Sequence, residues 1–105
     1  MPVLGIYHLN VNVSNLERSR AFYERLGFRV VETFHEDGNP DLDRGLGLER
    51  SHTDALFLRL GDDPRSTLID LVQWTEPAAV GGTPEMNRLG PVRIALRVKE
   101  LDRMV

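Results

Sequence analysis

The sequence predicts an α+β fold: a βαβββ module in which one strand and one helix precede three further strands, followed by the first strand and helix start of a second module. Three observations favour this fold. Residues 4–13 alternate between apolar and polar side chains, residues 15–26 show the spacing of an amphipathic helix, and the opening segment is repeated near the end of the chain. Alternation with a period of two is typical of a strand, and a period near 3.6 is typical of a helix.

The opening segment assigns a face to each of its side chains. Leu9, Val11 and Val13 fall on one side of the predicted strand, whereas His8, Asn10 and Asn12 fall on the other. The apolar side is the nearest surface that could bury the stripe of the following helix. We therefore expect the row of polar side chains to face a solvated concave surface.

The middle of the chain supplies three more strands. Gly27 is well placed to end the helix in a left-handed conformation. A polar segment with several glycine and proline breaks then separates the second strand from the third, and the histidines at its ends, His35 and His52, lie near acidic residues. We interpret that segment as a solvated acidic loop. The sequence thus predicts strands at 28–35, 55–60 and 67–74, a loop at 36–53 and a linker from 75 onward.

The repeat divides the chain into parts. The segment from His8 to Arg18 aligns with the segment from Arg93 to Arg103 at a constant offset, so that Val13 matches Val98. Repeated segments of this kind indicate a duplicated structural unit. We expect a first module at 1–76, a linker at 77–91 and the start of an incomplete second module at 92–105, whose first strand covers 92–98.

The composition excludes several classes of function. There is no cysteine, which removes disulfides, thiol catalysis and cysteine-based metal sites. The formal net charge is −3 and basic residues are scattered among acidic ones, so nothing indicates nucleic-acid binding. No apolar run approaches the roughly 20 residues of a membrane span, and the start lacks the features of a signal peptide. These properties fit a cytoplasmic protein without a membrane partner.

Three stretches resemble the vicinal oxygen chelate superfamily, which includes glyoxalase I, bleomycin-resistance proteins and extradiol dioxygenases. They are HLNVNVSNLERSRAFYERLGF (8–28), LIDLVQW (68–74) and GPVRIALRVKELDRM (90–104). The resemblance implies a cupped sheet made from two modules, with helices outside and the active site inside. In metal-dependent members, one ligand lies on the first strand and one on the fourth strand of each module. Those positions correspond here to His8, Asp70 and Arg93, and the fourth lies beyond Val105.

The pair His8 and Asp70 suggests a divalent metal. Asp70 shares its strand face with Leu68, Val72 and Trp74, and a lone carboxylate among apolar groups needs a cation or another partner. Imidazole and carboxylate together suit Zn, Ni, Co, Fe or Mn. Such a metal would polarise a carbonyl, stabilise an enediolate or activate oxygen, as in a lyase, isomerase or dioxygenase acting on a small oxygen-bearing molecule.

Arg93 departs from the metal-dependent pattern, because a guanidinium cannot ligate a metal. It would instead pair with Asp70 or clamp a carboxylate or phosphate of a ligand. The alternative function is therefore a metal-free, drug-sequestering type of binding module that uses Arg93, Trp74 and Phe57, with Asn10 and Asn12 adding polar contacts. A third interpretation is an inactive fragment of a two-module protein.

An unpaired strand at 92–98 would seek a partner strand. We therefore expect a homodimer in which two chains meet as the two modules do or exchange their C-terminal strands.

Overall fold

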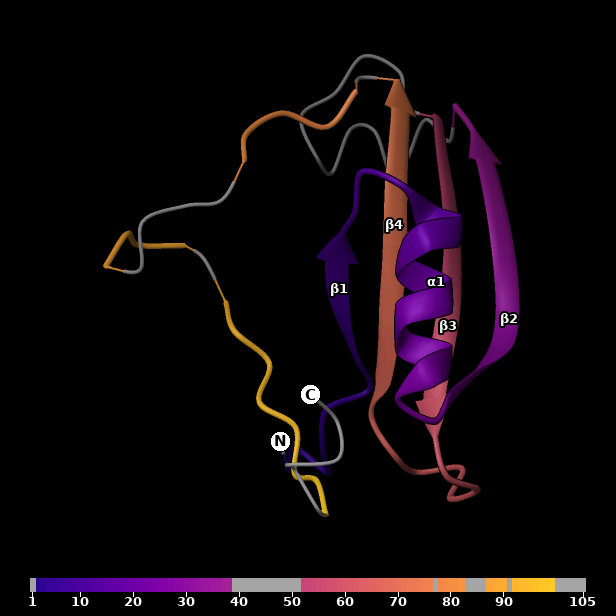
Figure 1. The fold of residues 1–105 in the computed structure, drawn as a ribbon, viewed down its shortest axis with the longest axis vertical. Helices are drawn as coiled ribbons and strands as arrows, with labels where there is room; N and C mark the ends of the chain where they lie inside the picture. The colour runs from indigo at the N-terminus through magenta and orange to yellow at the C-terminus, as the bar shows by residue number, and fades with distance from the viewer. Residues whose placement is uncertain (1, 39–51, 77, 83–86, 91, 100–105) are drawn as a thin grey trace.

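The chain folds into a four-stranded sheet with one helix lying across one of its faces, as seen in the computed structural model (Figure 1). The structure describes residues 2–38, 52–76, 78–82, 87–90 and 92–99. The described elements are β1 (His8–Asn12), α1 (Leu16–Arg25), β2 (Phe28–Asp37), β3 (His52–Leu60) and β4 (Leu68–Glu76). The predicted βαβββ module is confirmed.

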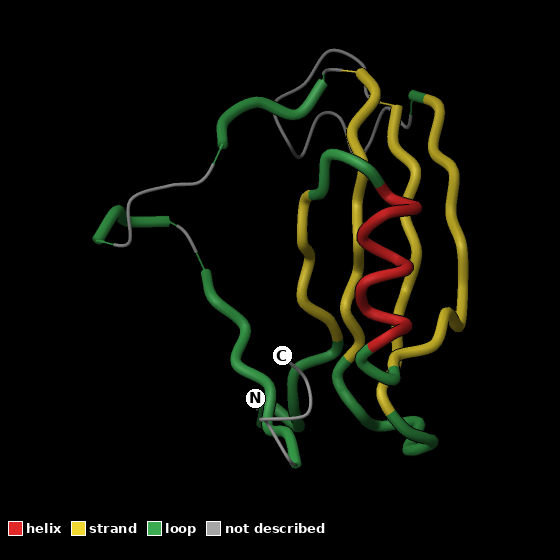
Figure 2. Tube along the Cα trace, viewed as in Figure 1, coloured by secondary structure: helices red, strands yellow, loops and turns green. Residues whose placement is uncertain are grey.

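The strands lie in the order β1-β4-β3-β2, so the first and last strands of the module are neighbours (Figure 2). β1 pairs with β4 in parallel, and β4, β3 and β2 form an antiparallel meander. The parallel register sets Asn10 directly beside Asp70. This pairing brings the polar face of the first strand next to the Asp70 carboxylate of the fourth.

The hydrophobic core lies between the sheet and α1, on the face that we call the outer face. Its buried members are Leu56 and Leu58 of β3, Ile69 and Leu71 of β4, and Phe28. Partly buried side chains of β1 and α1 pack against them, namely Val11, Val13, Leu16, Tyr23 and Leu26. The predicted apolar face of the first strand therefore does meet the helix, and His8, Asn10 and Asn12 lie on the opposite face, which we call the cup face.

Both ends of α1 have local hydrogen-bond partners. The Asn15 side chain accepts a hydrogen bond from the backbone N–H of Arg18 (3.0 Å), which makes it the N-cap. The backbone N–H of Leu16, the first residue of the helix, donates to Oε1 of Gln73 on β4 (2.8 Å) and so connects the helix start to the sheet. At the other end Gly27 adopts a φ of 102°, which a residue with a side chain rarely adopts.

Two sequence predictions need correction. The loop expected at 36–53 is shorter at both ends, because β2 continues to Asp37 and β3 already begins at His52; residues 39–51 lie outside the described part. The strand expected at 92–98 is not formed. Residues 92–98 lie outside the sheet, on the β1 side, without joining it (Figure 1), and a strand needs a hydrogen-bonded neighbour.

A β-bulge in β2 changes which side chains face the cup. The register with β3 shifts between Val30 and Glu32, which adds one residue to β2. Val30 lies opposite Leu58 on the outer face, but beyond the bulge Phe34 lies opposite Ala55 on the cup face. After a bulge, each residue of the strand lies on the face opposite to the one that simple alternation would give it. The second half of β2 thus directs its even-numbered side chains into the cup.

Candidate functional site

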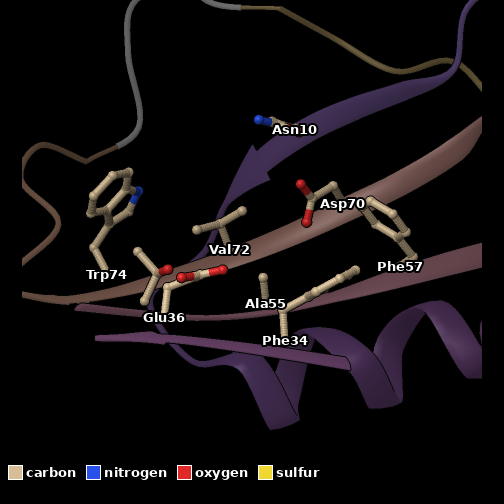
Figure 3. Close-up of a pocket in the computed structure, with 9 residues that line it drawn as sticks. Asn10, Phe34, Glu36, Ala55, Phe57, Asp70, Val72 and Trp74 are labelled. Atoms are coloured by element: carbon tan, nitrogen blue, oxygen red, sulfur yellow. The ribbon is translucent and has the colours of Figure 1, made fainter. Parts of the chain in front are cut away.

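A cavity of about 300 Å³ lies on the cup face, on the side of the sheet opposite α1 (Figure 3). Every strand of the sheet contributes to it. Its floor is apolar at the centre and carries two carboxylates, and it is lined by Asn10, Phe34, Glu36, Thr53, Ala55, Phe57, Asp70, Val72 and Trp74. Of the residues predicted for the site, Asn10, Phe57, Asp70 and Trp74 line this cavity.

His8 and Asp70 lie next to each other at its edge. The Nδ1 atom of His8 is 3.9 Å from Oδ2 of Asp70, and the side chains are 30% and 14% exposed. This separation exceeds that of a hydrogen bond. His8 Nδ1 and Asp70 Oδ1 are both buried without a hydrogen-bond partner. Neighbouring strands thus each carry a buried polar atom without a hydrogen-bond partner, a ring nitrogen on His8 and an acceptor oxygen on Asp70, which is uncommon because buried polar groups are nearly always paired.

Burial raises the pKa of the Asp70 carboxyl above its ordinary value, because water is partly removed from its charged form. The positive charge that His8 can carry acts in the opposite direction and lowers that pKa. Burial is the larger of the two effects. A cation at this position would compensate the charge of the Asp70 carboxylate.

Aromatic rings surround the pair. The His8 ring lies 5.0 Å from the ring of Tyr7 and 5.2 Å from that of Phe57, and Phe57 in turn meets Phe34 at 4.9 Å. These edge and tilted contacts hold the imidazole between apolar walls. The cup thus combines an apolar floor with a few polar groups, a composition typical of small-molecule sites.

Asn12 and Trp74 form a direct contact across the β1–β4 pair. The indole Nε1–H of Trp74 donates to Oδ1 of Asn12 at 2.9 Å. Asn12 is therefore paired within the protein and does not line the cavity, although it holds one of the residues that do. The structure places these two predicted site residues together at the end of the cup that is farther from His8.

Arg93 lies apart from the other predicted site residues. It is exposed and lies on the segment that leaves the sheet, and it does not line the cavity. In the described residues no ion pair joins it to Asp70, whose neighbour across the β1–β4 pair is the His8 imidazole. The interpretation that Asp70 pairs with Arg93 has no support within this chain.

Five cavity residues were missed by the sequence prediction: Phe34, Glu36, Thr53, Ala55 and Val72. Glu36 and Thr53 fell in the expected loop, and the bulge after Val30 reverses the phase that simple alternation would assign to Phe34. A β-branched and aromatic run that extends toward Asp37 was the available signal for a longer strand.

As a metal site, the cup offers two protein ligands. His8 Nδ1 and the Asp70 carboxylate have the donor types that zinc and other first-row divalent ions prefer, and their orphaned atoms fit a bound cation. Among the described residues, no three histidine or acidic side chains converge to hold an ion. Further ligands would have to come from water, from a bound molecule or from another chain.

Comparison with known families gives one family match. Residues 5–86 match the model of the glyoxalase/bleomycin resistance protein/dioxygenase superfamily. The chain belongs to this superfamily. Its fold resembles that of a glyoxalase family protein from Bacillus cereus, whose crystal structure superposes with a TM-score of 0.85 at 20% identity and covers 99% of this chain and 69% of that one. No curated protein sequence gives a significant match. Within the described residues of this superfamily member, no helix is long and apolar enough to cross a membrane.

Proposed function

We propose that the cup binds a small oxygen-bearing molecule and that His8 and Asp70 provide two ligands of a divalent metal there. The observation that supports this is the pair of buried atoms, His8 Nδ1 and Asp70 Oδ1, that have no hydrogen-bond partner in the structure. An unpaired carboxylate in an apolar cup is costly unless a cation compensates it.

A metal at this position would act as a Lewis acid toward a carbonyl or enediolate oxygen, which is the chemistry of a lyase, isomerase or dioxygenase. The residues of the chain have supporting roles. Phe57 and Tyr7 hold the imidazole of His8 in place, and the apolar floor keeps water away from the ligand. The Glu36 carboxylate lines the same cavity and is available to accept a proton from a bound molecule.

Metal titration of the purified protein tests the proposal. Zn²⁺, Ni²⁺ and Mn²⁺ are added after chelator treatment, and binding is followed by calorimetry and elemental analysis. Binding should be lost in Asp70→Asn and His8→Gln and kept in Glu24→Gln, a control that removes an exposed carboxylate of α1. Uptake below about a tenth of an equivalent, or equal uptake by Asp70→Asn, would refute the metal site.

The second candidate is a metal-free binding module. It is favoured by the apolar floor of the cup and by the lack of a third converging ligand among the described residues. A basic group of the bound molecule would then take the place of the metal beside Asp70. Chelator-treated protein that still binds an aromatic amine, followed by quenching of Trp74 fluorescence, would support this function over the metal-dependent one.

A homodimer would supply the further metal ligands that one chain does not provide in the cup. The two ligands of one chain and the two of a second copy would complete a coordination sphere, and the apolar side chains Val92, Ile94 and Leu96 offer a surface for contact or exchange. Light scattering with and without metal tests this assembly. A monomer under both conditions would exclude a shared site. The cytoplasmic location remains a prediction of the sequence.

A further inference from the structure

Four titratable side chains form a hydrogen-bonded group on the outer face, which we call the outer cluster: His35 and Asp37 of β2, with His52 and Asp54 of β3. His35 uses both ring nitrogens, Nδ1 to Asp54 Oδ1 at 2.5 Å and Nε2 to Asp37 Oδ2 at 2.8 Å. The other oxygen of Asp37 meets His52 Nδ1 at 2.5 Å. The sequence prediction of a solvated acidic loop is corrected here, because the four side chains belong to paired strands.

The cluster lies directly behind one wall of the cup. In the β2–β3 register His35 is opposite Asp54 and Asp37 is opposite His52. Successive side chains of a strand point to opposite faces. The residues interleaved with the cluster are therefore those that line the cavity from the other side, namely Phe34, Glu36, Thr53 and Ala55.

The charges in the cluster support one another. The hydrogen bonds that His35 donates to the carboxylates of Asp54 and Asp37 raise its pKa above the ordinary value of 6.5. The hydrogen bonds from His52 and His35 lower the pKa of Asp37 below its ordinary value of 3.8. The pairing is thus complete when the imidazole is protonated and the carboxylates are ionised.

Two neighbouring elements, α1 and β4, carry charged groups of their own. α1 packs against β2 and β3; its Arg20 pairs with Glu24 and its Arg18 donates to Ser14 Oγ, and among the described residues no ion pair joins its other charged side chains, Glu17 and Arg25, to the cluster. The β4 residue paired with Asp54 is the neutral Gln73, which accepts from the helix start, whereas the β4 residue paired with His52 is the acidic Glu76. Among the described residues no further ion pair reaches His35 or Asp54.

We propose that the outer cluster is a pH-sensitive clamp that positions the β2–β3 wall of the cup. When His35 is protonated, it joins the two strands at the level of Glu36 and Thr53 and fixes these residues at the cavity. When His35 loses its proton, a neutral ring faces two carboxylates and the clamp weakens. The cluster residues act as positioning residues and touch the ligand at no point.

The direction of the pH dependence follows from the pKa shifts. A raised pKa of His35 contributes stability that is complete below pH 6.5 and is lost as the pH rises through the higher pKa of the folded state. The lowered pKa of Asp37 contributes stability that is present above pH 3.8 and is lost as the pH falls through the lower pKa of the folded state. The clamp is therefore strongest in mildly acidic solution.

The experiment uses the metal-free protein, so its result is independent of the proposed metal site. Backbone hydrogen exchange is measured by NMR at pH 6 and pH 8 and corrected for the intrinsic pH dependence of exchange. Thermal unfolding is followed at the same pH values. The variants are His35→Gln and Asp54→Asn, and Glu24→Gln serves as the matched control because it removes a carboxylate from an exposed pair on α1.

In the wild type, protection of residues 34–37 and 52–55 should fall several-fold from pH 6 to pH 8, while β1 and β4 change little. The Tm should fall by about 2–4 °C over the same range, as expected for an exposed pair in a domain of this size. His35→Gln and Asp54→Asn should flatten both changes, and Glu24→Gln should retain them. Equal slopes in wild type and His35→Gln, or protection that rises with pH, would overturn the clamp.

A further readout is the fluorescence of Trp74, which should not change with pH if the outer cluster has a merely structural role. Trp74, the one tryptophan of the chain, lines the cup and is paired in register with Thr53. Its fluorescence should titrate with a midpoint above pH 6.5 in the wild type and lose this transition in His35→Gln. A titration that persists in His35→Gln contradicts coupling between the cluster and the cup.

Discussion

Two imidazole–carboxylate groups lie on opposite faces of the same sheet, and they differ in nearly every physical respect. On the cup face, His8 and Asp70 are 3.9 Å apart, and each has a buried atom without a partner. On the outer face, His35 is 61% exposed and is hydrogen-bonded through both ring nitrogens.

The environment of each group reverses the direction of the pKa shift. Burial raises the pKa of Asp70, whereas hydrogen bonds lower that of Asp37. The same residue types therefore form a pair with unpartnered buried atoms on one face and a hydrogen-bonded ionic cluster on the other. Residue identity alone says little about the role of such a group.

The largest expected effect comes from the core that supports both groups. Leu71 of β4 is fully buried beneath Asp70, and Leu71→Ala should destabilise the protein by about 2–5 kcal/mol, because it leaves a cavity between the sheet and α1. Urea unfolding measures the loss. Leu60→Ala is the matched control, since Leu60 is 51% exposed and should cost much less. Equal losses would show that this core does not support the two faces.

The sign of the stability change caused by Asp70→Asn should distinguish the His8–Asp70 pair from the outer cluster. In metal-free protein at pH 7 we expect it to raise stability by about 1 kcal/mol, since it removes a buried charge whose Oδ1 lacks a donor. The raised pKa of Asp70 means that the cost of its charge exists above the pKa of the folded state and disappears once the carboxyl is protonated. The stability gained by Asp70→Asn should therefore decrease toward pH 3. Thermal unfolding with a chelator measures it, and a loss of stability at pH 7 would contradict an unsatisfied Asp70.

The Trp74–Asn12 contact is the satisfied polar pair of the cup face. Trp74→Phe removes the donor and should cost about 0.5–1.5 kcal/mol. A double-mutant cycle with Asn12→Ala isolates the hydrogen bond from the change in ring size. A coupling energy near zero would mean that this pair, like His8 and Asp70, contributes no stability to the β1–β4 contact.

The smallest effect is expected for an ordinary exposed pair, which sets the baseline for the comparison. Glu24→Gln breaks the ion pair with Arg20 (3.3 Å) on α1 and should change stability by at most about 0.5 kcal/mol. Chemical unfolding at low and high salt measures this small change. An effect as large as that of Asp54→Asn would remove the distinction between the outer cluster and any surface ion pair.

The sequence was sufficient to place His8 and Asp70 on one face. Period-two alternation predicted which side chains of each strand share a face. The family resemblance implied that the first and fourth strands of the module line one cup. Alternation could not reveal the bulge between Val30 and Glu32, because a bulge depends on how two strands pair across a long connection. Phe34 and Glu36 were therefore missed.

The outer cluster was hidden from the sequence for a related reason. His35 and His52 are separated by a polar segment, and only the β2–β3 register sets them beside Asp54 and Asp37. The prediction of a strand at 92–98 was wrong for a different reason. Its alternation does predict a strand, but a strand pattern cannot supply the neighbour that a strand needs, and in this chain the sheet ends at β1.

The pairing of β1 with β4 also has a consequence for how the protein folds. These strands are joined through contacts as distant as 62 positions, while β2, β3 and β4 form successive antiparallel hairpins. Closing the longest loop costs the most chain entropy before any contact is gained. We therefore expect the hairpins to form first and β1 to dock last, so that the folding step that completes the sheet is also the step that brings His8 to Asp70.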